Sequence, residues 1–251
     1  MKPPSPRTRF VLLFLLATAA LFLNAEEPSA AALRAFNQYV QRIEPSLDSL
    51  TPSNPKELAI ERVNRPEEAA LPGAMLHHWR GTVFVPGATA ADFERMLRNY
   101  AGYPQVYAPE VLAARQTSGQ GNHLQASLRV RQKHVLTVVM DTDYDVWFLH
   151  PAAHRLVSIA RSTRVAEMDG AGTSHEHALP PAEEHGFLWR QNTYWSATER
   201  DGGLALQLDS ITRTRAIPRG LGWAVAPLVE SLPRHSLAFT LEATRRALEK
   251  R

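Results

Sequence analysis

The chain has 251 residues, of which 44% are hydrophobic and 21% are charged, a composition typical of a folded protein with one large or two small domains. It contains no cysteine, which excludes a disulfide framework and a cysteine-based zinc site. The net charge of +3 comes from Lys2, Arg7 and Arg9 and the rest of the chain is balanced, so nothing in the charge favours a nucleic-acid partner.

Residues 1–25 have the three parts of a secretory signal peptide. The basic residues precede an apolar stretch over residues 10–23, and Asn24-Ala25 leads to the acidic pair Glu26-Glu27. This stretch is shorter than the roughly 20 residues of a permanent membrane-spanning helix. We therefore expect export to the periplasm or the cell exterior. Cleavage is favoured over an uncleaved anchor, although Leu23 stands where a small residue is preferred.

Residues 26–73 are predicted to be an N-terminal helix and linker ahead of a main domain over residues 74–251. The spacing of apolar residues predicts a helix over Ser29–Leu50, kinked or ended near Glu44 by Pro45. The segments that follow are a linker (Thr51–Pro55), a short strand (Glu57–Val63) and a loop (Arg65–Gly73).

The main domain begins with a strand over Ala74–Val85 and a helix for which Thr89 is the N-cap, with Asp92 three residues later. Four further strands are predicted over Val111–Thr117, Asn122–Arg131, His134–Phe148 and Arg155–Ala166. The loop Asp169–His185 is long enough to suggest function or mobility. A final helix, with Pro233 in its first turn, presents the stripe Leu237, Leu241, Thr244 and Leu248.

The segment Gly186–Pro218 is predicted to be two long strands that fold back at Asp201-Gly202. Asp-Gly is a strong signal for a type I′ turn, in which both central residues need a positive φ. With a two-residue turn, the opposed pairs include Arg200 and Gly203, Trp195 and Leu208, and Tyr194 and Asp209.

The two faces of this hairpin differ in character, because side chains alternate along a strand. One face, predicted to be buried, is apolar near the turn and rich in hydroxyls farther away. The other, with Arg190, Asn192, Tyr194, Asp209, Arg213 and Arg215, can meet water, unless a single bulge exchanges the two faces. Buried hydroxyls and amides need partners, so the first face favours a cavity wall over a solid core, which stays the alternative.

The order of elements resembles the helix-grip fold of the START-like superfamily, which includes polyketide cyclases and the birch-pollen allergen group. The resemblance covers about Ala74–Leu248 and is carried by His77-His78-Trp79, Gly186–Arg190, Tyr194-Trp195 and Pro233–Leu248. It implies an α+β fold, in which a curved antiparallel sheet wraps around the long C-terminal helix, with an extra N-terminal helix. It also implies a ligand cavity between sheet and helix without identifying the occupant.

The candidate ligand-binding residues combine apolar area with orienting polar groups, as in small-molecule pockets. They are Trp189, Gln191, Thr193, Trp195, Leu206, Leu208, Ser210, Thr212, Leu237 and Leu241.

A metal site at His175-Glu176-His177 with Glu183, Glu184 and His185 is disfavoured, because Pro180-Pro181 interrupts the group. At most one ring of His77-His78 can enter the pocket. We interpret Asp141, Asp143 and Asp145 as a row on the water-facing side of their strand, paired with Arg129 or Arg131.

No nucleophile elbow, phosphate loop or paired-carboxylate motif is present, and we predict no cofactor, no metal and no catalytic residue. The sequence favours an exported, non-enzymatic binder or carrier of a hydrophobic, lipid-like molecule, gated by the terminal helix and the loop Asp169–His185. Two alternatives stay open. One is a cyclase- or hydrolase-type enzyme using Arg190, Tyr194, Asp209 or a histidine, and the other is an envelope interaction module docking through Ser29–Leu50. Peripheral membrane contact and oligomeric state are left open.

Overall fold

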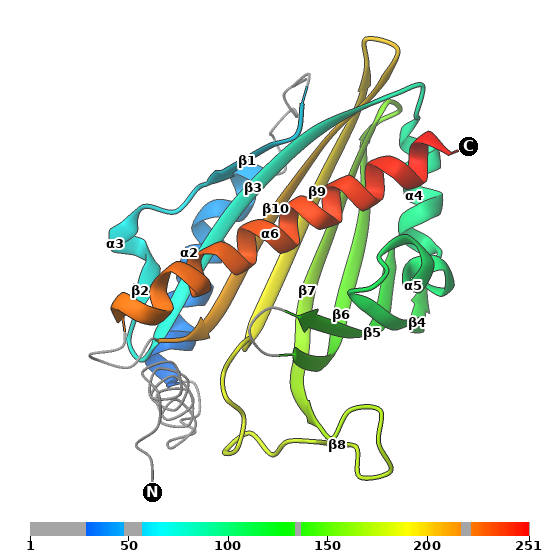
Figure 1. The fold of residues 1–251 in the computed structure, drawn as a ribbon. Helices are drawn as coiled ribbons and strands as arrows, with labels where there is room; N and C mark the ends of the chain where they lie inside the picture. The colour runs from blue at the N-terminus through cyan, green and yellow to red at the C-terminus, as the bar shows by residue number, and fades with distance from the viewer. Residues whose placement is uncertain (1–28, 48–56, 134–136, 217–221, 251) are drawn as a thin grey trace, which may run out of the picture.

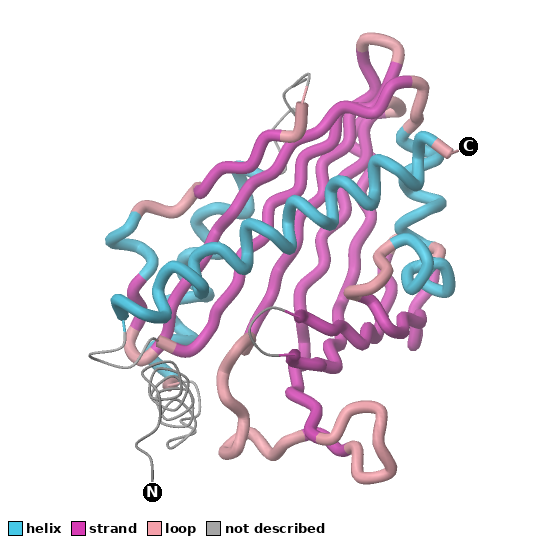
Figure 2. Tube along the Cα trace, viewed as in Figure 1, coloured by secondary structure: helices cyan, strands magenta, loops and turns pink. Residues whose placement is uncertain are grey.

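The computed structural model describes residues 29–47, 57–133, 137–216 and 222–250, which form one large antiparallel sheet with helices on both faces (Figures 1 and 2). The strand order is β1-β3-β10-β9-β7-β6-β5-β4, with β2 paired to β3 and β8 paired to β7. This is the α+β helix-grip architecture that the sequence predicted. The signal-peptide segment lies outside the described residues, and among the described helices none is long and apolar enough to cross a membrane.

The helices are α2 (Ala30–Leu47), α3 (Pro66–Ala69), α4 (Ala90–Arg98), the 3-10 turn η1 (Tyr100–Gly102), α5 (Tyr103–Val106) and α6 (Gly222–Glu249). The longer strands are β3 (Ala74–Pro86), β4 (Val111–Gln120), β5 (His123–Lys133), β6 (Thr137–Ala152), β7 (Arg155–Asp169), β9 (Arg190–Arg200) and β10 (Gly203–Arg215). The shorter strands are β1 (Ala59–Arg62), β2 (Ala70–Leu71) and β8 (His177–Ala178).

The hairpin β9–β10 forms as its sequence predicts. Asp201 and Gly202 have φ values of 52° and 75°, both positive as a type I′ turn requires. Trp195 pairs with Leu208 and Tyr194 with Asp209, and the register continues without a bulge from Arg200 to Arg190. The two faces of the hairpin therefore keep the composition read from the sequence, and the exchange of faces by a bulge does not occur.

Several parts of the chain differ from the sequence prediction. The N-terminal helix does not end near Glu44 but continues through Pro45 to Leu47, and the loop expected over Asp169–His185 contains β8. The loop expected over Arg65–Gly73 contains α3 and β2, and β1 and β2 both pair with β3. The last helix does not start at Pro233 but at Gly222, and it continues through Pro227 and Pro233. Proline lacks an amide hydrogen and usually ends or kinks a helix. Here the helix continues along the sheet, and residues 222–232 form its first turns.

The helix α6 crosses one side of the sheet, which we call the α6 face (Figure 1). The close approach of α6 to β3 depends on Gly81, since a Cβ built there would lie 2.2 Å from Leu241 Cδ1 and 3.4 Å from Leu237 Cδ2. The same Cβ would also lie 2.7 Å from Ile60 Cδ1, so a larger side chain fits only if the ends of the Leu241 and Ile60 side chains move. The missing side chain of Gly81 thus makes room for the side chains that α6 and β1 pack against β3.

The opposite side, which we call the α2 face, is covered by the N-terminal helix. Phe36, Tyr39 and Val40 of α2 are buried against Tyr194 and Ile211 of the hairpin. The prediction that this face of the hairpin meets water is therefore wrong. The strand alternation was correct, but it does not reveal that a distant helix covers the second face.

We expect Gly81→Val to destabilise the protein by about 1–3 kcal/mol, because the added side chain would overpack the contact with Leu241 and Ile60. Urea unfolding would measure this loss. In the double variant with Leu241→Ala, which removes the nearest colliding methyl group, the cost of Gly81→Val should shrink. A Gly81→Val cost that is independent of Leu241 would contradict the proposed contact.

Candidate functional site

The part of the α6 face near the hairpin turn is a packed core. Trp195, Leu206 and Leu208 are buried together with Leu237 and Leu241 of α6. The Trp195 ring meets the Phe93 ring of α4 edge to face, with centroids 5.1 Å apart. Five of the ten predicted lining residues therefore pack against one another and against α4, and they belong to the core.

The polar part of the same face is more open. Gln191, Thr193 and Ser210 are half-buried, and Ser210, Thr193 and Ala160 form a row across β10, β9 and β7 in direct register. These four residues are called the hydroxyl floor below. Polar bonds hold it in place, since Tyr144 Oη donates to Gln191 Oε1 at 3.0 Å. These interior strands therefore retain a surface that water reaches on the side where a cavity was predicted.

Trp189 lies on the other side of the sheet. It is buried with Ala32 and Ala74, and Arg213 Cζ lies 5.9 Å from its ring centroid on the α2 face. Trp189 precedes the first residue of β9, so the alternation that places Trp195 does not apply to it. The structure thus separates Trp189 from the other nine residues of the predicted lining.

Beyond the hydroxyl floor, His77 of β3 stands opposite Thr212 of β10 on the α6 face. His77 is 1% exposed and Thr212 is 7% exposed. Burial, with a smaller effect of Arg62, lowers the pKa of His77 to about 4, so its ring is neutral at physiological pH. One ring of the pair His77-His78 therefore enters this face, as the sequence predicted, and it enters uncharged.

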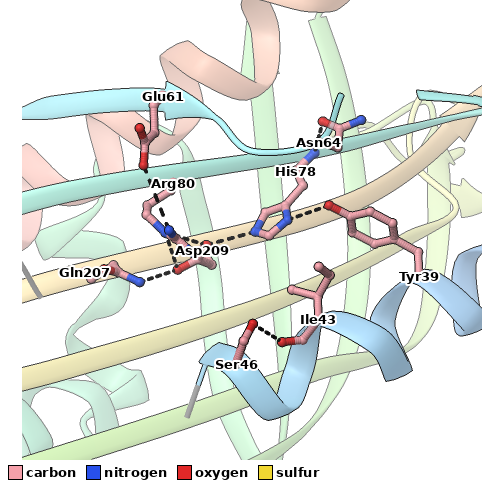
Figure 3. A network of polar contacts seen from close by, with 9 residues as sticks. All are labelled: Tyr39, Ile43, Ser46, Glu61, Asn64, His78, Arg80, Gln207 and Asp209. Carbon is pink, nitrogen blue, oxygen red and sulfur yellow. Dashed lines mark hydrogen bonds and ion pairs between the residues drawn. The ribbon is translucent and has the colours of Figure 1, made fainter. Parts of the chain in front are cut away.

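The other histidine belongs to a buried polar network on the α2 face (Figure 3). His78 Nε2 lies 2.8 Å from Asp209 Oδ1, and His78 Nδ1 lies 2.9 Å from Tyr39 Oη. Arg80 Nε and Gln207 Nε2 also donate to Asp209, which is 1% exposed. Both ring nitrogens of His78 are engaged within the protein, so this network fastens α2 to the sheet and leaves no free base for a substrate.

A second polar cluster also joins α2 to the sheet. Arg161 of β7 makes two bonds to the Glu44 carboxylate, at 2.8 and 2.9 Å, and Tyr194 Oη donates to Glu44 Oε1 at 2.6 Å. Burial and the neighbouring Glu44 carboxylate raise the pKa of Tyr194 well above its ordinary value, which keeps its hydroxyl protonated. The apolar stripe of α2 is largely covered by its own domain. An uncovered apolar stripe would have favoured the interaction module that docks through this helix, and α2 does not present one.

The loop over residues 169–185 is tied to the sheet by carboxylates. Glu167, 2% exposed, accepts from the backbone amides of Gly186 and Phe187 and contacts His185 Nδ1 at 2.8 Å. Glu176 accepts from Arg129 at 2.6 Å. Across the described ranges, no group of three or more His, Asp or Glu residues is placed to hold a metal ion. Glu167 was missed by the sequence analysis, because nothing in an alternating strand marks a carboxylate that will bind backbone amides.

Of the three outward aspartates, only Asp141 pairs as predicted among the described contacts, through two bonds from Arg129 at 2.7 and 2.8 Å. Asp143 lies 3.7 Å from Arg164, and Asp145 accepts from Gln125 at 3.0 Å. Near them, a polar pocket of about 340 Å³ is lined by residues of β4, β5, β6 and β7, among them Arg115, Gln125 and Asp143. Arg115 and Gln125 are exposed. This pocket contains no residue of the predicted lining.

The fold and the face under α6 define the class of this protein as a helix-grip protein. No protein-family model and no curated protein sequence matches the chain. Solved structures resemble it in fold. The STAR-related lipid transfer protein from Xanthomonas axonopodis is 16% identical, with 75% of this chain and 98% of that chain covered and a TM-score of 0.48.

Two further structures are the Zhui aromatase/cyclase from Streptomyces sp. R1128 and human STARD10. The first is 17% identical, over 70% of this chain and 95% of that chain, with a TM-score of 0.48. The second is 9% identical, over 82% of this chain and 78% of that chain, with a TM-score of 0.47. The likeness to START-like proteins concerns the fold alone and says nothing of what this chain binds.

The low pKa of His77 predicts a stability loss in mild acid. The folded pKa of about 4 lies below the ordinary value of 6.5, so His77 favours folding above pH 6.5 and loses this contribution as the pH falls toward 4. The loss should reach about 3 kcal/mol, at roughly 1.4 kcal/mol per pKa unit. Urea unfolding between pH 7 and 4 should show a shallower pH dependence for His77→Leu than for the wild type. Parallel curves would contradict a neutral buried His77.

Asp209→Asn should destabilise the protein by about 3 kcal/mol or more, because Arg80 and His78 would lose the carboxylate that both contact. Asp143→Asn is the matched control, since Asp143 lies 3.7 Å from Arg164 in an exposed pair. Its cost should stay within about 0.5 kcal/mol. Chemical unfolding of both variants would test this, and equal effects would show that the network does not hold α2.

Proposed function

We propose that this protein is a non-enzymatic binder or carrier of a hydrophobic, lipid-like small molecule on the α6 face. The single observation that supports this proposal is the hydroxyl floor, where Ser210, Thr193 and Ala160 stay half-buried on interior strands beside a closed apolar core. A solid core would bury such a row completely, and an ordinary surface would carry charged side chains there.

The physical basis of binding would be apolar burial against the edge of the packed core, with hydrogen bonds to the floor. Apolar burial contributes about 25 cal/mol per Å², before the cost of association is subtracted. Trp195 and Leu208 border the floor on one side, and Thr212, which pairs with Gln191, borders it on the other. A ligand there would therefore have an apolar body and a polar end.

We place this activity in the periplasm or outside the cell, on the composition of residues 1–25 alone. The enzymatic alternative has less support than binding does. Tyr194 and Asp209, named as acid–base candidates, lie on the α2 face and are engaged in polar networks there. Release of a chemically altered ligand after incubation with the protein would favour the enzyme instead.

Filling the hydroxyl floor should abolish binding. We expect Thr193→Trp to weaken binding of the neutral fluorescent probe N-phenyl-1-naphthylamine at least tenfold, because the indole would occupy the floor. Thr117→Trp is the matched control, since Thr117 is exposed on β4 and the same substitution there should leave the affinity unchanged.

The measurement is a fluorescence titration of purified, delipidated protein, with circular dichroism to verify that both variants fold. Failure of the wild type to bind the probe, or an equal loss in both variants, would overturn the proposed site.

A further inference from the structure

Three polar atoms of the α6 face are buried without a hydrogen-bond partner among the described residues. They are His77 Nδ1, Trp79 Nε1 and Thr212 Oγ1. Buried polar groups in native proteins nearly always have a partner, and an unsatisfied one calls for an explanation such as a bound molecule. Three such atoms on one face therefore indicate an occupant that supplies the missing bonds.

The three residues are neighbours in the sheet. His77 pairs with Thr212 across β3 and β10, and the next pair on the same face is Trp79 with Ser210. Ser210 belongs to the hydroxyl floor, so the unpartnered atoms adjoin it directly. We call His77, Trp79 and Thr212 the polar end of the site.

The chemistry of the polar end calls for an oxygen atom. The Trp79 indole can only donate a hydrogen bond, and the Thr212 hydroxyl can donate or accept. The neutral His77 ring offers either an N–H or a lone pair at Nδ1, depending on its tautomer. A hydroxyl or carbonyl oxygen can accept from Trp79, and a hydroxyl can in addition donate to His77 or Thr212.

The charges on this face disfavour an ionised ligand. On the described parts of β3, β10, β9 and β7, the charged side chains on the α6 face are Glu167 and the exposed Asp169 at one end and Glu199 at the other. Glu167 binds the amides of Gly186 and Phe187, and Glu199 accepts from the Ala90 amide. The cation that acts on His77 is Arg62 of β1, whose Nε donates to Asn64 Oδ1. A buried carboxylate or phosphate would lack a dedicated counter-ion.

We propose that His77, Trp79 and Thr212 bind the hydroxyl or carbonyl end of an uncharged amphiphile, whose hydrocarbon body lies along the hydroxyl floor. This inference rests on the proposed function and adds the class of ligand, a neutral alcohol, ketone or ester rather than a fatty acid or a phospholipid. The alternative occupant of the polar end is ordered water, which can satisfy the same atoms without selecting a ligand.

The test compares 1-decanol with decanoate, which have equal chain lengths but differ in charge. Equilibrium dialysis of the purified protein at pH 8 should show 1-decanol binding at least tenfold more tightly than decanoate, because decanoate is fully ionised there. Equal affinities, or a preference for decanoate, would overturn the assignment of an uncharged ligand.

Two conservative variants test the polar end itself. Trp79→Phe removes one N–H and Thr212→Val removes one hydroxyl, and each should weaken 1-decanol binding about fivefold or more. Thr117→Val, at the exposed position on β4, should leave it unchanged. Binding of N-phenyl-1-naphthylamine by both variants verifies that the site is folded and intact.

The outcomes separate this inference from the proposed function. If the wild type binds the naphthylamine probe but does not prefer 1-decanol, or if both variants bind 1-decanol like the wild type, the polar end holds only water and the inference fails alone. If the wild type binds neither the probe nor 1-decanol, the proposed function fails, and the inference fails with it.

Discussion

The pairing of β3 with β10 is the constraint on which both faces of the sheet depend. On one face it brings His78 and Arg80 to Asp209, and on the other it sets His77 beside Thr212 and Gly81 beneath α6. A register shift of one residue would exchange the faces of every side chain on β3. It would bury the imidazole of His77 on the α2 face and put a side chain in place of Gly81 under the helix. The packing of α2 on one face and of α6 on the other therefore favours the same register of β3 and β10.

Most of the sheet could be predicted from the sequence because local patterns determine it. Asp201-Gly202 specified the turn, and a two-residue turn fixed the whole register of β9 and β10. The coverage of the second face could not be predicted in the same way. It depends on where α2, which precedes the sheet in the chain, docks on it, and no local pattern encodes that position. Trp189 was misplaced for a related reason, since alternation holds only within a strand.

The candidate site was predicted in part. The sequence indicated which side chains of the hairpin share a face and the gradient from apolar to hydroxyl side chains along β10, but alternation cannot distinguish a packed core from a binding surface. That distinction depends on α4 and α6. Phe93 of α4 and Leu241 of α6 fill the space beside Trp195, whereas Thr193 and Ser210 remain half-buried. The position of a helix across the sheet is a tertiary property, which the composition of a strand does not contain.

The sheet also separates two electrostatic environments. On the α2 face the buried charge of Asp209 is matched by Arg80 and the half-buried charge of Glu44 by Arg161, so attraction is strongest at Asp209, where the dielectric is low. On the α6 face burial instead favours the neutral forms of His77 and Tyr144. It lowers the pKa of His77 to about 4 and raises the pKa of Tyr144 to about 12. At neutral pH neither group is charged, and His77 is too weak a base to remove a proton efficiently. Such a face is suited to hold an uncharged ligand rather than to carry out acid–base chemistry on it.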